Sequence, residues 1–302
     1  MKTINIRVPA TTANLGAGFD VFGMALSLYN ELSFETDEDS SAIKCEIEGE
    51  GAEELTAAGT DNLVVRSMRR LADECGRPLP RGVLSMKNRI PLARGLGSSS
   101  AAIVGGLYLA DRILGTGLSK QELLAVAVAI EGHPDNVAPA LLGHCIASVQ
   151  GDAGWETVSY HVPAAWKWVA CVPQTPLSTA AARRALPATV AHADAVRNIG
   201  ATTFFLSALV KENPQYLRLA FRDRLHVPYR LPLISGGENV LATAVAAGAY
   251  AATISGSGST LLAVCDSSSA TRVAEAMAVA FGAEEGAQSF VLDVCTTGVV
   301  EI

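Results

Sequence analysis

Residues 91–102 combine glycine and serine in an order that favours the binding of an anion. The segment has the sequence PLARGLGSSSAA, in which two glycines precede three consecutive serines at 98–100. Small apolar residues follow and predict a helix. Backbone N–H groups and hydroxyls at a helix N-terminus suit a phosphate group, and glycine lets the backbone approach it closely. The order matches neither a Walker loop nor a dinucleotide fingerprint, and a strand-to-helix turn capped by serine would have the same residue types.

Residues 131–139, with the sequence EGHPDNVAP, hold a second group of polar side chains. Glu131, His133, Asp135 and Asn136 lie within six residues of one another. No second histidine or cysteine lies at ligand spacing, so the segment does not predict a zinc site. A helix–break–helix connection in which Asp135 caps the second helix would explain the same residues without any chemistry.

Two glycine-rich segments and one arginine-bearing segment complete the candidates. Residues 10–23 have the sequence ATTANLGAGFDVFG, residues 255–260 have SGSGST, and residues 223–230 have DRLHVPYR. Polar residues in loops after strands often carry function. Each segment also has an ordinary explanation: a glycine-rich connection, a hairpin loop, or surface arginines in salt bridges.

The elements that must position these segments alternate along the chain. Period-two alternation predicts strands, and apolar residues three and four apart predict helices. Pro9 is expected to end the first strand, and the order of elements in the second half suggests a split βαβ sandwich. Strands are predicted over 3–8, 26–35, 43–48, 82–90, 143–150, 156–162, 166–172, 251–254, 261–265 and 289–295. Helices are predicted over 62–75, 101–114, 119–130, 178–186, 190–210, 216–221, 239–247 and 270–281.

Composition excludes several classes of protein. The 302 residues include 23 basic and 30 acidic side chains, a formal charge of −7 that offers no footprint for nucleic acid. None of the six cysteines lies within four residues of another, which argues against a metal or redox motif. No apolar run reaches the ~18 residues of a membrane span, and the first residues lack the apolar region of a signal peptide. We therefore expect a cytoplasmic protein with reduced cysteines and no nucleic-acid or membrane partner.

The four glycine-rich or polar clusters, at 10–23, 91–102, 131–136 and 255–260, resemble those of the GHMP small-molecule kinases. That superfamily has the pattern P-x-x-x-N-L-G-x-G-x-D, then P-x-x-x-G-L-G-S-S, then a G-S-G loop near the C-terminus. The match covers nearly the whole chain, and the segments EGHPDN, STAAARRALP and RLHVPYR are similar to those of members that phosphorylate homoserine. Ala17, Arg197 and Ser259 depart from the pattern, and Ser259 stands where proline is usual. The matching residues are Pro9, Asn14, Leu15, Gly16, Gly18 and Asp20; Pro91, Gly95, Leu96, Gly97, Ser98 and Ser99; and Gly256, Ser257 and Gly258.

The resemblance implies a two-domain α+β fold. Residues 1–155 would form an ATP-binding N-terminal GHMP kinase domain with a left-handed βαβ unit, against the usual right-handed rule. Residues 156–302 would form a C-terminal domain with a ferredoxin-like α/β sandwich. The implied activity is ATP-dependent phosphorylation of the side-chain hydroxyl of L-homoserine to O-phospho-L-homoserine, in threonine biosynthesis, by a homodimer that uses Mg²⁺.

The resemblance also assigns roles to individual residues. Ser99 and Glu131 would ligate Mg²⁺, since a hard cation prefers oxygen ligands. Asn136 and Thr179 would join them as catalytic residues near the acceptor hydroxyl. The substrate would be bound by Arg183 and Arg230 at its carboxylate, by Asn14, Asp20 and Asp135 at its ammonium, and by His133 lining the pocket. Nucleotide binding is assigned to Asn62, Pro91, Leu92, Ala93, Arg94, Gly95, Leu96, Gly97, Ser98, Ser99, Ser100, Ala101, Gly256, Ser257 and Gly258.

The general base and the acceptor leave alternatives open. Asn136 stands where many GHMP kinases carry aspartate, and an amide cannot accept a proton. A loose phosphoryl-transfer transition state does not demand early deprotonation, which leads to the hypothesis of base-free transfer. One alternative function is another GHMP kinase, acting on mevalonate, shikimate or a sugar. A sugar would need neither charge of an amino-acid pocket. The other is a non-catalytic GHMP-fold binding protein, against which Glu131 and the serine loop argue.

Overall fold

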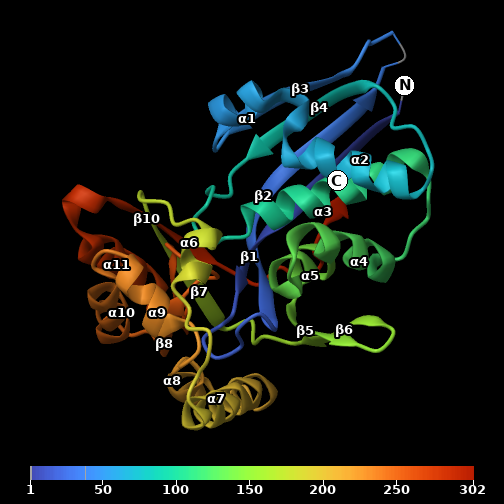
Figure 1. The fold of residues 1–302 in the computed structure, drawn as a ribbon. Helices are drawn as coiled ribbons and strands as arrows, with labels where there is room; N and C mark the ends of the chain where they lie inside the picture. Colours follow the sequence, from blue (N-terminus) through green and yellow to red (C-terminus); the bar gives the residue numbers. More distant parts are fainter. Residues whose placement is uncertain (1, 38) are drawn as a thin grey trace.

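Two β-sheets, each with helices packed on it, make up the molecule (Figure 1). The computed structural model describes residues 2–37 and 39–302, and for 283–285 the backbone alone. The first sheet has the strand order β11-β1-β2-β4-β3, and β5 pairs with the start of β2 and forms a hairpin with β6. Its strands in the described chain are β1 (Thr3–Ala13), β2 (Phe22–Thr36), β3 (Ile43–Gly49), β4 (Gly82–Asn88), β5 (Cys145–Gly151), β6 (Gly154–Tyr160) and β11 (Val300–Glu301).

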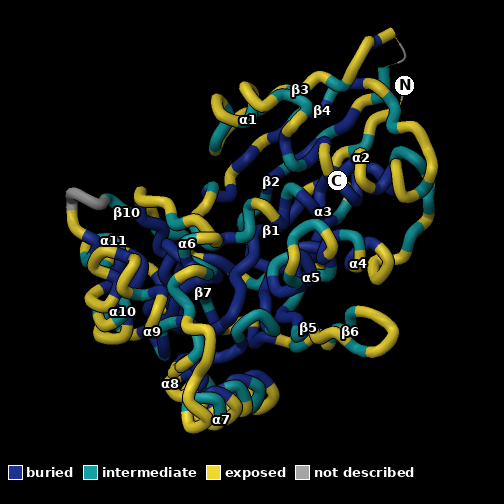
Figure 2. Tube along the Cα trace, viewed as in Figure 1, coloured by how far each residue is buried: buried dark blue, intermediate teal, exposed yellow. Residues whose placement is uncertain are grey.

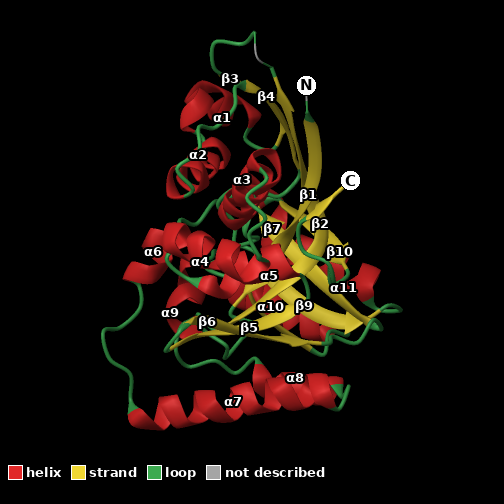
Figure 3. Cartoon of the chain, turned by 90° about the vertical axis from the view of Figure 1, so that its right-hand side faces the viewer, coloured by secondary structure: helices red, strands yellow, loops and turns green. Residues whose placement is uncertain are grey.

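Helices of the first half cover one face of this sheet (Figure 3). Strands β3 and β4 are parallel neighbours, and the connection between them runs through the first two helices, which makes it a βαβ unit. Its left-handed sense stays a prediction. The helices are α1 (Ala52–Ala58), α2 (Leu63–Glu74), α3 (Ser98–Leu114), α4 (Lys120–Glu131) and α5 (Pro134–Leu142), with a 3₁₀ turn at Gly59–Asp61.

The second sheet has the order β10-β7-β9-β8, and all its neighbouring strands are antiparallel. This order is that of a ferredoxin-like β-α-β-β-α-β unit, which confirms the predicted sandwich. Helices α7 and α8 form a layer at the edge of the molecule (Figure 3). The strands are β7 (Trp166–Pro173), β8 (Ala251–Ile254), β9 (Leu261–Asp266) and β10 (Ala287–Leu292). The helices are α6 (Thr179–Arg184), α7 (His192–Val210), α8 (Leu217–Ala220), α9 (Val227–Arg230), α10 (Gly237–Ala246) and α11 (Ala270–Glu285), with 3₁₀ turns at Pro214–Tyr216 and Leu231–Leu233.

Helix α3 lies at the centre of the first layer, where two glycines let it approach its neighbours. A Cβ on Gly106 would lie 2.4 Å from the carbonyl oxygen of Val64 in α2, and a Cβ on Gly105 would lie 2.3 Å from Leu32 in β2. Side chains at either position would push the helix away from these elements. Figure 2 shows the buried stretches that run through β1, β2 and α3. The packing of α3 in the core therefore fixes the position of its N-terminus, which carries the serines.

Several predicted boundaries were wrong, and two of them matter most for the site. Strand β1 continues past Pro9 to Ala13, because the register with β2 shifts between Pro9 and Ala10 and this bulge accommodates the proline. Helix α3 begins at Ser98 rather than at 101, so the three serines form its first turn instead of preceding it. Helix α1 was not predicted: it has only seven residues, and none of them is buried.

The place of the domain division stays a proposal. The predicted division at residues 155 and 156 falls inside β6, which pairs with β5 in the first sheet. We propose to place it at 161–165, between β6 and the first strand of the second sheet. The last strand, β11, returns to pair with β1. No helix in the described part of the chain has the length and apolar character that a membrane crossing requires.

Candidate active site

The four clusters, together with Thr179 and the two arginines, meet around one polar cavity between the two sheets. Its volume is about 100 Å³, and it opens beside a second, apolar cavity of about 350 Å³. The sequence-predicted residues that line the polar cavity are Asn14, Asp20, Ala93, Arg94, Gly95, Gly97, Ser98, Ser99, Ser100, Glu131, His133, Asp135, Asn136, Thr179, Arg183, Arg230, Gly256 and Ser257. Leu177, which was not predicted, lines it as well.

Six predicted nucleotide-binding residues do not line the polar cavity. Asn62, Leu92 and Ala101 line the apolar cavity. The side chain of Leu96 is buried in the core, and Pro91 lines a different cavity beside Gln174. Gly258 lies against Ile234 and Leu177. Leu96, Pro91 and Gly258 therefore shape their loops instead of facing either cavity.

The serine loop is held in place by close backbone contacts with β1 and with residues 255–260. A Cβ on Gly97 would lie 1.9 Å from Thr11 Oγ1, and a Cβ on Gly95 would lie 2.3 Å from the carbonyl oxygen of Ser255. The Ser255 hydroxyl lies 2.6 Å from the carbonyl oxygen of Gly95 and 2.8 Å from Thr12 Oγ1. Both glycines have positive φ, 69° and 77°, so glycine is required there for conformation as well as for space.

The first turn of α3 presents oxygen ligands together with a helix N-terminus. Ser99 Oγ donates to Glu131 Oε2 at 3.0 Å, and Ser100 Oγ donates to Glu131 Oε1 at 2.9 Å. No side chain of the described residues caps this turn, since the N-cap is Gly97. The described residues also contain no group of three carboxylate, imidazole or thiol side chains that could enclose a metal. Two hydroxyls and one carboxylate suit a hard cation that takes its remaining ligands from phosphate and water.

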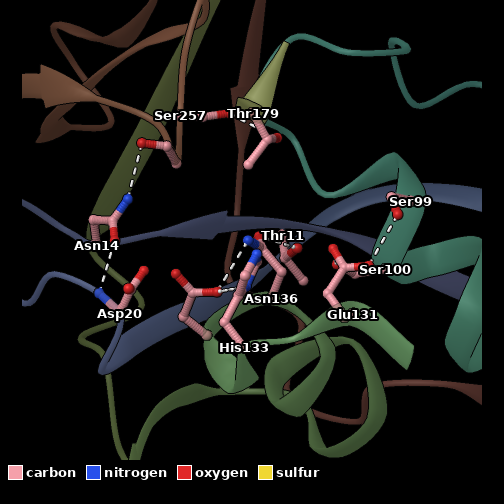
Figure 4. Close-up of polar contacts among 12 residues, drawn as sticks. Thr11, Asn14, Asp20, Ser99, Ser100, Glu131, His133, Asn136, Thr179 and Ser257 are labelled. Carbon is pink, nitrogen blue, oxygen red and sulfur yellow. Dashed lines mark hydrogen bonds and ion pairs between the residues drawn. The ribbon is translucent and has the colours of Figure 1, made fainter. Parts of the chain in front are cut away.

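A chain of hydrogen bonds joins Thr11 to three residues that line the polar cavity (Figure 4). Thr11 Oγ1 donates to Asn136 Oδ1 at 2.8 Å, and Asn136 Nδ2 donates to Asp135 Oδ1 at 3.3 Å. His133 Nδ1 donates to the same carboxylate oxygen at 2.7 Å. This hydrogen bond raises the pKa of His133, against the opposing effect of burial. The chain fixes the Asn136 amide with its oxygen toward Thr11, which leaves one N–H free to point elsewhere.

Thr11 was not among the predicted site residues, because residues 10–23 were expected to form a loop. In the structure it is a fully buried residue near the end of β1. A buried threonine hydroxyl must find a partner, and Asn136 supplies it. The signal in the sequence was the pair Thr11–Thr12 directly after an alternating strand.

Asn14 and Asp20 lie in the turn between β1 and β2, at the other side of the cavity in Figure 4. Both adopt left-handed backbone conformations, with φ of 70° and 56°. Asn14 Nδ2 donates to the Gly256 carbonyl at 2.8 Å, and its Oδ1 accepts from the Asp20 N–H at 3.0 Å. The Asn14 side chain therefore joins this turn to the loop from the second sheet.

The two arginines differ in burial and in partners. Arg183, on α6, donates two hydrogen bonds to the Asp20 carboxylate at 2.9 and 3.1 Å, and both side chains are more than a third exposed. Arg230 is only 2% exposed and donates to the carbonyl oxygens of Ala182 and Gly256, both at 3.3 Å. It has no carboxylate partner within 4.0 Å among the described residues. Burial and the neighbouring Arg183 lower the pKa of Arg230, but guanidinium stays protonated in proteins. A buried cation without a counter-ion favours an anionic ligand.

The apolar cavity has the character of a site for a flat aromatic group. Leu55, Leu63 and Met86 line it, and none of its described lining residues is charged. Asn62 lies at its wall, but its amide is engaged by the protein. Its Oδ1 accepts from Val65 N at the start of α2, and its Nδ2 donates to the Gly59 carbonyl at 2.7 Å. Asn62 therefore shapes this wall by capping the helix.

Thr179 lies where the two cavities meet. It lines both of them, and its hydroxyl lies 3.3 Å from Ser257 Oγ. Ser259, which replaces the proline usual in the resembling family, donates from its hydroxyl to the Thr175 carbonyl at 2.6 Å. This bond ties the third loop to the segment that leads into α6.

Two family models match the chain: GHMP kinases N terminal domain over residues 62–144 and GHMP kinases C terminal over residues 205–283. The chain is 44% identical to a homoserine kinase of Moorella thermoacetica, over 98% of this chain and 99% of the relative. It is 41% identical to a homoserine kinase of Picosynechococcus sp., over 99% of both.

The chain is also similar to solved structures that have this fold. A homoserine kinase from Cytophaga hutchinsonii superposes with a TM-score of 0.87 at 28% identity, over 100% of this chain and 98% of that one. A mevalonate kinase of L. major, in complex with R-mevalonate, superposes with a TM-score of 0.76 at 14% identity, over 97% and 96%. The second similarity concerns the fold alone.

Proposed function

This chain belongs to the homoserine kinases of the GHMP kinase superfamily. From that premise we propose how the cleft formed by its polar and apolar cavities binds the two substrates. The reaction is the transfer of the γ-phosphoryl group of ATP to the side-chain hydroxyl of L-homoserine, a step of threonine biosynthesis. One observation carries the proposed site most directly. The cavity beside the serine loop is lined both by carboxylates and by a buried cation, Arg230, which has no ion-pair partner among the described residues. A zwitterionic acceptor needs both charges, and a sugar or mevalonate does not.

ATP would span the two cavities. The apolar cavity suits the adenine ring, and the first turn of α3 suits the phosphates, because the helix N-terminus attracts anions. The two cavities share Ala93, Ser98, Ser99 and Thr179, so the base and the phosphates can be bound side by side.

Mg²⁺ would be held by Glu131 and Ser99, whose oxygen atoms already lie within 3.0 Å of each other. Ser100, bonded to the other oxygen of Glu131, orients that carboxylate. When bound, the ion supplies neutralisation of charge on the phosphoryl group that is transferred.

Homoserine would lie between the two arginines and the acidic residues. Arg230 and Arg183 would bind the carboxylate, since planar guanidinium groups match it. Asn14, Asp20 and Asp135 would surround the ammonium, and His133 would close the pocket beside Asp135. The acceptor hydroxyl would then lie near Thr179 and Asn136, between the serines and the turn that joins β1 to β2, which we call the substrate turn.

We propose that transfer needs no general base. The Asn136 amide is fixed by Thr11 and Asp135, so its free N–H can orient the acceptor oxygen but cannot remove a proton. In a loose transition state the proton can leave late, to phosphate or to water.

Asn136→Ala should lower kcat by up to about 100-fold, because the acceptor hydroxyl loses its orientation. The variant should not change the shape of the pH profile of kcat. If His133 accepted the proton, kcat would fall as the pH falls through the pKa of His133. Because Asp135 raises the pKa of His133, Asp135→Asn would then move the limb to lower pH. A limb that moves in this way, at saturating concentrations of both substrates, would contradict base-free transfer.

The acceptor is tested by ATP consumption with homoserine, mevalonate, shikimate and galactose. We expect turnover with homoserine and at least about 100-fold lower kcat/KM with the other three, because none of them presents an ammonium group to Asp20 and Asp135. Absence of turnover with homoserine would overturn the proposed function.

We propose a homodimer in the cytoplasm, where ATP is available. Exposed apolar side chains support an interface on α7: Val196, Ile199 and Val210 are 54%, 68% and 75% exposed. Such residues on one helix favour contact with another protein surface. Light scattering of the purified chain measures its mass in solution.

A further inference from the structure

Phe19 lies in the substrate turn between β1 and β2, next to Asp20, and none of the roles above uses it. Its ring lies beside both arginines of the cleft. The guanidinium carbon of Arg230 is 5.0 Å from the ring centroid, and that of Arg183 is 6.0 Å away. Phe19 is thus the aromatic ring against which both cations of the proposed carboxylate site pack.

The ring of Phe19 is itself held by a buried histidine. The His226 ring stacks on it at 5.1 Å between centroids and 21° between planes. His226 is fully buried, and its Nε2 donates to the Gly16 carbonyl at 2.9 Å. Its Nδ1 has no partner among the described residues, and burial lowers the pKa of the ring, which keeps it uncharged at neutral pH.

His226 is the N-cap residue of α9 and Arg230 is its last residue, and the side chains of both lie against the ring of Phe19. Asp223 fixes the start of this helix, since its carboxylate accepts from the backbone N–H groups of His226 and Val227, both at 2.7 Å. Phe19 therefore packs on a surface formed by a neutral aromatic group and a buried cation.

Two guanidinium groups at one carboxylate site repel each other before any anion binds. Arg183 is balanced by Asp20, whereas Arg230 has, among the described residues, only two hydrogen bonds, both 3.3 Å long and both to carbonyl groups. The face of an aromatic ring attracts cations through its quadrupole, more strongly where water is excluded. The ring of Phe19 can supply this attraction to both arginines, and its fixed plane can orient their guanidinium groups.

We infer that Phe19 is a positioning residue for the substrate carboxylate, which it recognises indirectly by holding Arg183 and Arg230. The inference rests on the proposed function, because it assigns these arginines to homoserine. Its consequence is specific: loss of the aromatic ring should weaken the recognition of the carboxylate and of no other part of the substrates.

The test compares Phe19→Leu and Phe19→Tyr with two acceptors. One is L-homoserine, and the other is 3-aminopropan-1-ol, which is homoserine without its carboxylate. Phe19→Leu should raise KM for homoserine about tenfold and leave KM for ATP unchanged. It should leave kcat/KM for 3-aminopropan-1-ol, or its inhibition constant against homoserine, within about twofold of wild type. Phe19→Tyr keeps a ring and should restore the wild-type KM.

Phe22→Leu is a matched control. Phe22 lies three residues further on, is 3% exposed, and packs against Phe205 and Tyr160, with no arginine near its ring among the described contacts. The Phe22→Leu variant should have lower thermal stability, and any change in its kinetic constants should be the same for the two acceptors. If Phe19→Leu weakens the binding of both acceptors equally, or if Phe19→Tyr does not restore the wild-type KM for homoserine, the residue has only a packing role and the inference is wrong. If the wild-type chain does not phosphorylate homoserine, the proposed function fails and takes the inference with it.

Discussion

Replacing Glu131 by glutamine should lower turnover by roughly 10²–10³-fold, the range seen when one electrostatic contact to a reacting group is removed. Glu131 is the carboxylate that the hydroxyls of Ser99 and Ser100 meet at the first turn of α3. Glutamine has nearly the same shape: its amide oxygen can accept from one serine hydroxyl, and its amide N–H can donate to the hydroxyl oxygen of the other. The fold should therefore survive, and the loss should reflect the missing negative charge at the proposed Mg²⁺ site.

Titration with Mg²⁺ separates this explanation from a structural one. The Mg²⁺ concentration for half-maximal rate should rise in Glu131→Gln and stay unchanged in Glu122→Gln. Glu122 lies on the same helix but at its other end, where it forms a capping box with Ser119. Its replacement should lower thermal stability slightly without affecting turnover. A Glu131→Gln enzyme with wild-type turnover and Mg²⁺ requirement would exclude Glu131 as a ligand.

Arg230→Met should lower kcat/KM for homoserine by roughly 10²–10³-fold and leave KM for ATP within about twofold of wild type. A buried, hydrogen-bonded charge that loses its partner costs several kcal/mol of binding, which corresponds to this range. Methionine fills similar space and carries no charge, so the buried site stays packed. Arg183→Met should have a smaller effect, because Arg183 is 39% exposed and water screens its charge.

Arg184→Met provides the control for these two variants. Arg184 is the next residue on α6, it is exposed, and it is in no ion pair among the described residues. We expect this variant to have wild-type values of kcat and of KM for both substrates. An Arg230→Met enzyme with unchanged KM for homoserine would show that the carboxylate binds elsewhere. Steady-state kinetics with each substrate varied in turn decides the matter.

The sequence located the four clusters because their residue types report on local backbone conformation. Glycine at 95 and 97, and the serines after it, mark a turn that leads into a helix, and the structure has that turn. The capping box at Ser119 and Glu122 was equally local, and both of its hydrogen bonds are present. Short-range chemistry of this kind can be read along the chain.

The contacts between clusters could not be read in this way. Asp20 and Arg183 are 163 residues apart, and Asn14 and Gly256 are 242 apart. Their meeting depends on how the two sheets pack, and no spacing in the sequence encodes that. The role of Thr11 was hidden for a related reason, because Pro9 was expected to end its strand and the bulge that accommodates the proline is a property of pairing with β2.

The ion pair between Asp20 and Arg183 has a consequence for how the enzyme discriminates among small molecules. It joins the two side chains to which an ammonium and a carboxylate would separately bind. An amino acid can replace this one pair by two, so the exchange is electrically balanced. A simple amine or a simple acid would also break the ion pair. It would bind one of the two side chains and leave the other without a charged partner. The ion pair of the substrate-free enzyme therefore disfavours singly charged metabolites, because only a zwitterion replaces both of the interactions that are lost.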